Sequence, residues 1–188
     1  MAGRILQHLR QNSKLIGYCA LVFSAGLTGG FMLLPYVEDR VKELLPSIFE
    51  GIIVEGSSFR TAVNILLRNM KASLIMLFLG ITVVVPLLVL FVNGFMAGLI
   101  LRLAVEESIP AKTTILGVVF HGMPELLAIF VSAAFGLRIG FALFSAKDRV
   151  EEVKTSVTQA AQVFLRFILP LLVLSAFIEA YVSSSFVL

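Results

Sequence analysis

The sequence predicts an all-α, polytopic membrane protein: a transmembrane helical bundle with broken or re-entrant helices and interfacial amphipathic helices. Of its 188 residues, 59% are hydrophobic and 14% are charged, whereas an average soluble domain has about 45–50% apolar and about 25% charged residues. Mean hydropathy is +1.00. A chain of this length cannot bury so much apolar surface in a soluble core, so the excess must face lipid. These values exclude a soluble globular enzyme, a disordered tail and a coiled-coil rod.

The cysteine count and the distribution of charge exclude further classes of protein. The single cysteine, Cys19, lies inside an apolar run, which excludes a disulfide framework and a cysteine-based metal cluster. The net charge of +3 is not gathered into a basic patch with interleaved aromatics, so we expect no nucleic-acid partner. Positive residues that anchor helix ends in the cytosol explain this charge more simply. We expect one integral membrane domain over residues 1–188, with no metal and no cofactor.

The first apolar block, residues 15–37, follows three basic residues and holds several glycines. A basic start before an apolar stretch is also typical of a cleaved signal peptide. This stretch is about 20 residues long, which is enough to cross the hydrocarbon core of a bilayer. We therefore interpret it as a retained transmembrane helix whose N-terminus is cytoplasmic.

Residues 38–71 form the longest polar stretch. Apolar residues recur in it at helical spacing, and Gly56-Ser57-Ser58 divides it into two halves. Ser58 is a plausible N-cap for the second half. The pattern predicts two amphipathic helices that lie in the plane of the membrane interface. The alternative is a solvated helical hairpin packed on the other spans.

Three further membrane segments follow, at residues 72–101, 113–144 and 161–182. The first two are too long for one tidy span and too short for two full ones. Each contains helix breakers: Gly80, Pro86 and Asn93-Gly94 in the first, and Gly122-Met123-Pro124 in the second. Backbone that breaks at membrane depth is tolerated only where protein or a wet cavity covers it. We expect each of these two segments to be either a long kinked helix or a pair of half-length helices.

The distribution of Lys and Arg bears on the number of crossings. Both the N-terminus and residues 147–154 carry cations, which favours the cytosolic side for both. Four crossings would place them on opposite sides, whereas five crossings place both inside and the C-terminus outside. We favour five, with one broken block counted twice.

Glycines four residues apart occur in three of the apolar blocks: Gly26/Gly30, Gly94/Gly98 and Gly136/Gly140. Such small-xxx-small faces let two helix backbones approach closely. They predict a helix-packing or oligomer interface, and with it a homodimer. Packing within one chain alone is the equally weighted alternative.

Polar residues inside the apolar blocks are the candidates for function. His121 and Glu125 are four residues apart, and we expect them to form a polar cluster with Asn93 and Arg138. A carboxylate inside a membrane is costly unless it is paired or hydrated, so Glu125 is a functional candidate by default. The cluster has four interpretations: structural hydrogen bonding, a proton or ion relay, binding of a partner or lipid headgroup, or a catalytic or metal site. We expect no enzyme, since the His-Glu-x-x-His pattern of zinc proteases is missing.

The order and spacing of these motifs resemble the stage II sporulation protein M family. The residues that carry the resemblance are Leu66-Leu67-Arg68-Asn69, Phe91-Val92-Asn93-Gly94-Phe95-Met96-Ala97-Gly98, His121-Gly122-Met123-Pro124-Glu125-Leu126 and Ala134-Phe135-Gly136-Leu137-Arg138-Ile139-Gly140. The resemblance covers the chain from about Leu15 onward. It implies a non-enzymatic membrane scaffold that gathers peptidoglycan-degrading partners at a remodelling membrane.

Together, these observations predict a protein that shapes or thins the lipid bilayer as a homodimer and holds envelope-remodelling partners. Short, broken membrane segments beside interfacial helices create hydrophobic mismatch, which deforms lipid at fractions of a kcal/mol per Å. The alternative is a transporter or channel for a small solute or ion, with a midplane site near His121 and Glu125. A wet cavity reaching Glu125 favours transport, whereas a lipid-filled concavity favours bilayer shaping.

Overall fold

A computed structural model describes residues 2–49, 57–107, 122–145 and 149–181, and within these ranges the chain is helical with no strand. The all-α prediction is confirmed. The elements in chain order are α1 (Ala2–Gln11), α2 (Ser13–Phe49), α3 (Ser58–Phe78), the 3₁₀ turn η1 (Leu79–Thr82), α4 (Val84–Glu106), α6 (Met123–Ser145), α7 (Arg149–Val163), the π-helical segment η3 (Phe164–Ile168) and α8 (Leu169–Tyr181).

Within the described residues, five helical stretches are long and apolar enough to cross a membrane: Ser13–Leu44, Ser58–Thr82, Val84–Glu106, Met123–Phe144 and Arg149–Tyr181. Two thirds of the most apolar stretch of α6 is buried in the protein, against 22–28% in the other four. Helix α6 is therefore the central helix of the bundle, and its Phe135 is the largest fully buried side chain.

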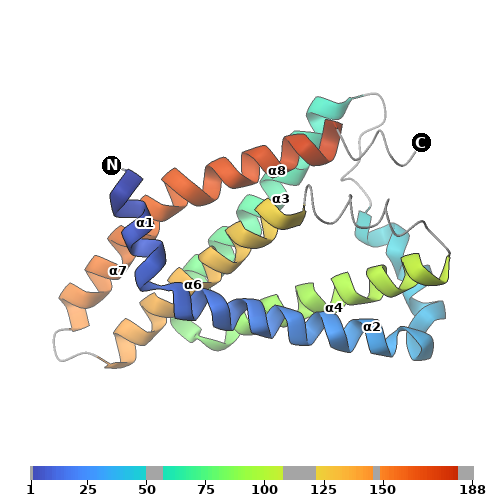
Figure 1. Cartoon of the computed structure of the whole chain (residues 1–188), viewed down its shortest axis with the longest axis horizontal. Helices are drawn as coiled ribbons and strands as arrows, with labels where there is room; N and C mark the ends of the chain where they lie inside the picture. The colour runs from blue at the N-terminus through green and yellow to red at the C-terminus, as the bar shows by residue number, and fades with distance from the viewer. Residues whose placement is uncertain (1, 50–56, 108–121, 146–148, 182–188) are drawn as a thin grey trace.

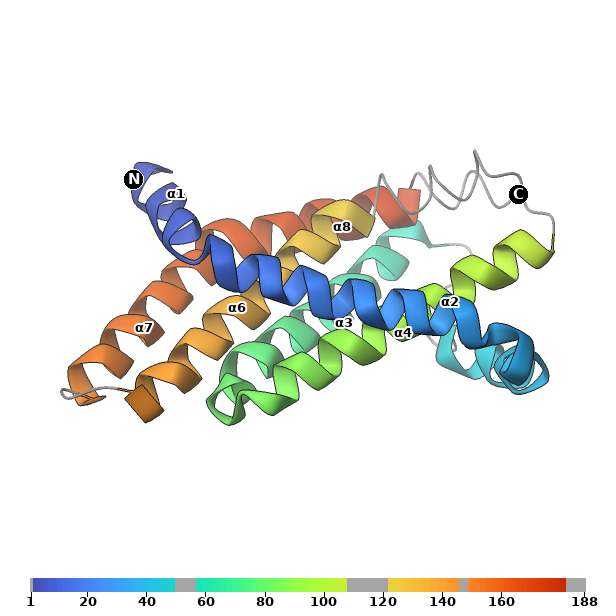
Figure 2. The same cartoon turned by 60° about the horizontal axis from the view of Figure 1, so that its bottom comes forward.

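The helices form two groups (Figure 1). Helices α2 and α4 pack side by side in one group, and α3, α6 and α8 pack on one another in the second. The groups meet where η1 contacts α6, and they diverge toward the opposite end, where α2 and α4 run away from α3 and α8 (Figures 1 and 2). The described helices are thus arranged as a wedge rather than a cylinder.

The two helices predicted over residues 38–71 are ends of longer helices rather than separate elements. Residues 38–49 are the last part of α2, and residues 58–71 open α3, which runs on into the next apolar block. Their position in the membrane interface stays a prediction. Local ion pairs favour the helical extension, since Lys42 Nζ lies 2.8 Å from Glu38 Oε1 and Arg40 Nη1 lies 3.3 Å from Glu43 Oε2. The N-cap of α3 is Ser57 rather than the predicted Ser58. The hydroxyl of Ser57 accepts a hydrogen bond from the backbone N–H of Arg60.

The predicted break within residues 72–101 exists at the first of its three breakers, because Gly80 lies in η1. The chain turns at η1 and Val83, whereas Pro86 lies in the first turn of α4 and Asn93-Gly94 lie inside that helix. Proline is tolerated in a first helical turn because the N–H it lacks has no partner there. This segment therefore supplies the end of one candidate span and most of the next, in agreement with five crossings.

The later segments also depart from their predicted bounds. Helix α6 begins at Met123 with Pro124 in its first turn, whereas residues 113–121, including His121, lie outside the described residues. Residues 161–181 belong to a longer helix that starts at Arg149 and includes the π-helical segment.

Candidate functional site

The described residues bring four polar side chains together where α3, α6 and α8 pack on one another. The side-chain amide of Asn69, on α3, donates a hydrogen bond to the carboxylate of Glu125, on α6. The carboxylate of Glu179, on α8, is close enough to Glu125 to interact with it electrostatically. The guanidinium of Arg68 interacts electrostatically with both carboxylates. We call these four residues the three-helix polar cluster.

The position of each residue on its helix explains its role in this cluster. Asn69 is buried, with 9% of its surface exposed, and shares one face of α3 with the buried Ile65 and Ser73. Arg68 is the preceding residue and is exposed at the edge of the same interface. A buried amide can both donate and accept hydrogen bonds. Attraction between the guanidinium and the two carboxylates stabilises the packing of α3 on α6 and α8. One guanidinium beside two carboxylates leaves a formal charge of −1, so the cluster can also hold a proton.

The structure does not assemble the cluster predicted from sequence. Asn93 is exposed, and its amide donates to the carbonyl of Val89 in its own helix at 2.9 Å. Arg138 donates to Asn12 Oδ1 at 3.3 Å. Arg138 lies 13 residues after Glu125 on the same helix, which places the two about 20 Å apart along its axis. The partner of Glu125 is Asn69, which sequence reasoning placed only in a family motif.

The glycines at 26, 30, 94 and 98 bring α2 and α4 into backbone contact within the chain. A Cβ added at Gly26 would overlap the carbonyl oxygen of Phe91, and one added at Gly94 would overlap the carbonyl oxygen of Phe23. Gly30 and Gly98 continue the same contact one turn further along. Both pairs are thus used for packing between α2 and α4.

The third glycine pair lies where α6 meets the end of α3 and η1. Gly136 and Gly140, on α6, lie against Gly80 in η1, and a Cβ at any of these three positions would overlap backbone atoms. Gly80 was not paired with either of them by sequence reasoning, because their contact depends on how η1 meets α6. All three pairs thus serve helix packing within the chain, and an oligomer interface at any of them stays a prediction.

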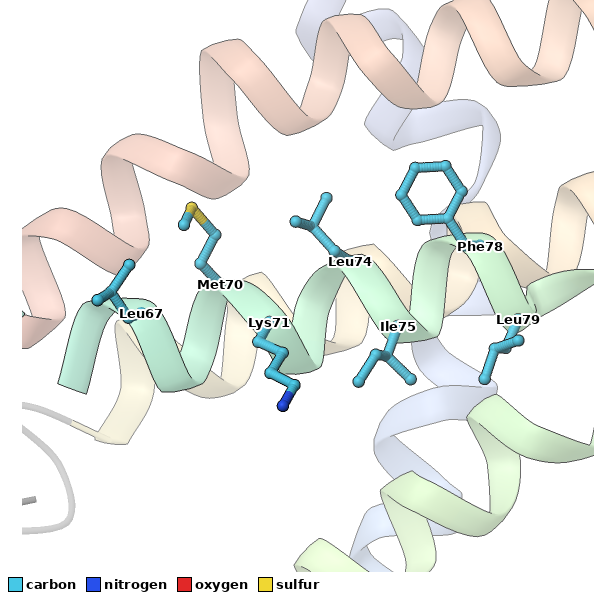
Figure 3. Close-up of a pocket in the computed structure, with 7 residues that line it drawn as sticks. All are labelled: Leu67, Met70, Lys71, Leu74, Ile75, Phe78 and Leu79. Carbon is cyan, nitrogen blue, oxygen red and sulfur yellow. The ribbon is translucent and has the colours of Figure 1, made fainter. Parts of the chain in front are cut away.

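One face of α3 carries an open apolar groove that contains a lysine (Figure 3). Its lining residues all come from α3 and the start of η1: Leu67, Met70, Lys71, Leu74, Ile75, Phe78 and Leu79. Lys71 and Ile75 point away from α8, whereas Leu74 and Phe78 point toward it (Figure 3). Among the described residues, no carboxylate lies within ion-pair distance of Lys71.

Comparison with known proteins identifies the family. No curated protein and no solved structure matches the chain. Residues 19–184, most of the chain, match the family described as Stage II sporulation protein M. This match confirms the resemblance carried by the motifs around Asn69, Asn93, Glu125 and Gly136, and the five apolar helices fit an integral membrane protein. The chain belongs to the stage II sporulation protein M family.

Proposed function

We propose that this protein is a non-enzymatic membrane protein that locally thins and bends the lipid bilayer and holds envelope-remodelling partners at the deformed patch. The position of Lys71 carries the bilayer-shaping part of this proposal. The part that concerns partners rests on the family resemblance alone. Homodimerisation also stays a prediction.

Lys71 lies deep within its candidate span. It is 13 residues after Ser58 and 11 residues before Thr82, so either end of the span is about 16–20 Å away along the helix axis. In a flat bilayer about 30 Å thick, this position would be near the middle of the hydrocarbon. That distance is longer than the four-carbon side chain of a lysine can bridge.

A second cation lies at the same level. The rings of Phe59 on α3 and Phe177 on α8 are 6.4 Å apart, which fixes the register of these antiparallel helices. Lys71 lies 12 residues after Phe59, and Arg166 lies 11 residues before Phe177. Both cations are exposed. Two cations at one level of neighbouring helices favour water or lipid headgroups at this depth.

Thinning the bilayer costs less free energy than placing the two cations in the middle of its hydrocarbon. A Lys or Arg in the middle of a bilayer costs about 2.5–3.5 kcal/mol on insertion scales. Thinning the bilayer costs fractions of a kcal/mol per Å of mismatch. Hydrating Lys71 and Arg166 by drawing headgroups toward them is therefore favourable. The diverging helix groups support bending as well, because a wedge occupies unequal areas in the two leaflets.

Cysteine labelling in proteoliposomes tests the hydration of this level. Cys19 is fully buried, so replacing it with Ser leaves a cysteine-free background for Leu67→Cys and Leu174→Cys, both of which keep the charge of Lys71. Both leucines are exposed; Leu174 lies 7 residues from the end of its span, whereas Leu67 lies 9 residues from the nearer end of its own. We expect a membrane-impermeant maleimide to react faster at position 67, which is four residues before Lys71, than at position 174. The opposite order would show a flat bilayer and overturn the proposal.

Electron cryomicroscopy of the protein in lipid nanodiscs measures the thinning itself. The bilayer density beside α3 is expected to be thinner than the density far from the protein. Lys71→Met keeps a similar side-chain length without the charge and is expected to restore part of the thickness. Lys154→Met, on the polar helix α7, is the matched control and should leave the thickness unchanged. Uniform thickness around the parent protein would contradict the proposal.

A transporter or channel remains the competing function, and the three-helix polar cluster is the observation that favours it. Two carboxylates between membrane helices can carry a proton. Glu125→Gln keeps the shape of the side chain but removes its charge. If the parent protein supports pH-driven flux in liposomes and a stably folded Glu125→Gln variant does not, transport replaces bilayer shaping as the function.

A further inference from the structure

A polar pocket lies at the corner between α1 and α2, away from the three-helix polar cluster and from the groove on α3. Its lining residues come from the α1–α2 corner, the second half of α6 and the start of α7: Gln11, Asn12, Leu15, Arg138, Phe141, Ala142 and Glu152. Three of the lining side chains are apolar and four are polar or charged. Such a mixed lining suits a molecule that has a polar and an apolar part.

The side chain of Asn12 is buried in this pocket and held in one orientation. It is the residue between α1 and α2, and only 4% of its surface is exposed. Its Nδ2 donates to the carbonyl of His8 at 2.8 Å, which orients the amide and leaves Oδ1 to accept from Arg138 Nη1 at 3.3 Å. The guanidinium of Arg138 is therefore held in place by a neutral group.

The charge of Arg138 is not balanced at short range by the described residues. Arg138 is half-buried, and no carboxylate of the described part of the chain lies within ion-pair distance of it. A guanidinium has five N–H donors arranged to bind the oxygens of a phosphate or carboxylate in pairs. One amide oxygen uses a single donor, so most of the donors remain for an anion.

The pocket lies where polar helices meet apolar ones. Helices α1 and α7 are polar and pack on each other, whereas α2 and α6 continue from the pocket into apolar spans. This boundary is the level at which phospholipid phosphates lie. Leu15 and Phe141 form an apolar wall on which the start of a lipid chain can rest. Exposed Arg10 and Lys14 flank the corner and add positive potential.

We propose that this pocket binds the headgroup of an aminophospholipid, with its phosphate on Arg138 and its ammonium on Glu152. Arg138 and Asn12 supply the positive charge and the fixed geometry for the phosphate. Glu152, on the α7 side of the same pocket, supplies a carboxylate that favours a headgroup carrying a primary ammonium over one carrying a hydroxyl. This inference does not depend on the proposed bilayer shaping.

Binding of short-chain lipids to the purified protein in detergent tests the site. The probes are dihexanoyl phosphatidylethanolamine, dihexanoyl phosphatidylglycerol and, as soluble forms of the same chemistry, phosphoethanolamine and inorganic phosphate. The readouts are the bound-lipid mass by native mass spectrometry and the rise in Tm that a ligand of the folded state produces. We expect phosphatidylethanolamine to bind more tightly than phosphatidylglycerol and both soluble probes to bind more weakly.

Variants assign the contacts. Arg138→Gln removes a charge-assisted hydrogen bond, so it should weaken phosphatidylethanolamine binding about tenfold or more. Asn12→Asp, which neutralises Arg138 in place, should have the same effect and covers the case in which Arg138→Gln does not fold. Glu152→Gln should make the two lipids bind equally, and the matched control Arg149→Gln, at an exposed residue of α7 outside the pocket, should change nothing. Unchanged lipid binding in Asn12→Asp, equal binding of the two lipids by the parent, or equally tight binding of phosphoethanolamine would overturn the proposal.

Discussion

The side-chain amide of Asn69 on α3 donates a hydrogen bond to the carboxylate of Glu125 on α6, and this bond joins a peripheral helix to the central one. A buried amide whose acceptor is removed keeps its desolvation penalty, about 1–3 kcal/mol. We therefore expect Glu125→Ala to destabilise the protein by about that amount. Glu125→Gln keeps an acceptor for Asn69 and should cost less.

A double-mutant cycle measures this contact by thermal unfolding in detergent. Residues that share a contact show coupling energies of about 0.5–3 kcal/mol. We expect Asn69→Ala and Glu125→Ala together to cost less than the sum of the two single changes. Glu151→Ala, at an exposed residue of α7, is the control and should be neutral. Additive losses would mean that the two side chains act independently.

Glycine substitutions separate packing within the chain from packing between chains. Gly29 and Gly30 are neighbours in α2, but a Cβ at Gly30 would overlap the Phe95 carbonyl, whereas one at Gly29 would make an ordinary contact with the Phe95 ring at 3.8 Å. Gly30→Ala should lower Tm in detergent. Gly29→Ala should be neutral or stabilising, because alanine favours a helix by about 0.5–1 kcal/mol over glycine. A Gly30→Ala variant that keeps its Tm but fails to self-associate would place an oligomer interface at this glycine instead.

Val83 makes the turn between η1 and α4 in a backbone conformation that suits glycine. Its φ is 59° and its ψ is −44°, and such a conformation costs a β-branched residue about 1–3 kcal/mol. We expect Val83→Gly to recover most of this energy, which offsets the lost packing of a half-buried side chain. Val157→Gly, in α7, has no such compensation and should lower the free energy of unfolding by about 1 kcal/mol. Equal losses in the two variants would rule out strain at Val83.

Five crossings make a definite prediction about sidedness. In the cysteine-free background, cysteines at Gln7 and Val150 should react with an impermeant reagent from the cytosolic side of the membrane. A cysteine at Asp39, which is exposed at the other end of α2, should react from the opposite side. Labelling of all three positions from one side would contradict the crossing by α2 and the count of five, and labelling of Gln7 from the outer side would contradict the cytoplasmic N-terminus.

The helical class and the five candidate spans follow from composition and segment length, because those properties act along the chain and do not depend on its folding partners. Sequence names Gly80, Pro86 and Asn93-Gly94 as candidate breakers, but which of them makes the turn does not follow in this way. Proline and Asn-Gly signal a break in any sequence, yet Pro86 fits a first helical turn and Gly94 fits a helix contact. Gly80 is required at the turn because Gly136 approaches it, and only the packed structure shows that approach.

The same reason limits the prediction of the site. Glu125 was identified because a carboxylate in an apolar block is costly wherever its partner lies. Its partner depends on which helices pack on one another. Asn69 and Asn93 are equally plausible in the sequence, but α3 packs on α6 along the face that holds Asn69, whereas Asn93 is exposed on α4. Without knowledge of which helices pack together, the sequence does not show which of the two asparagines is the partner of Glu125.

The π-helical segment between α7 and α8 sets the phase of the last helix. Every fourth residue is buried from one end of this helix to the other: Ser156, Ala160, Phe164, Ile168, Leu172, Ala176 and Ala180. A regular α-helix has 3.6 residues per turn, so a row of residues spaced by four winds gradually around the helix. The π-helical segment Phe164–Ile168 has wider turns and therefore reduces this winding. Deleting one residue there would rotate α8 by about 100° relative to α7 and move Glu179 away from Arg68. Insertions and deletions among relatives should therefore avoid this segment unless the buried row shifts with them.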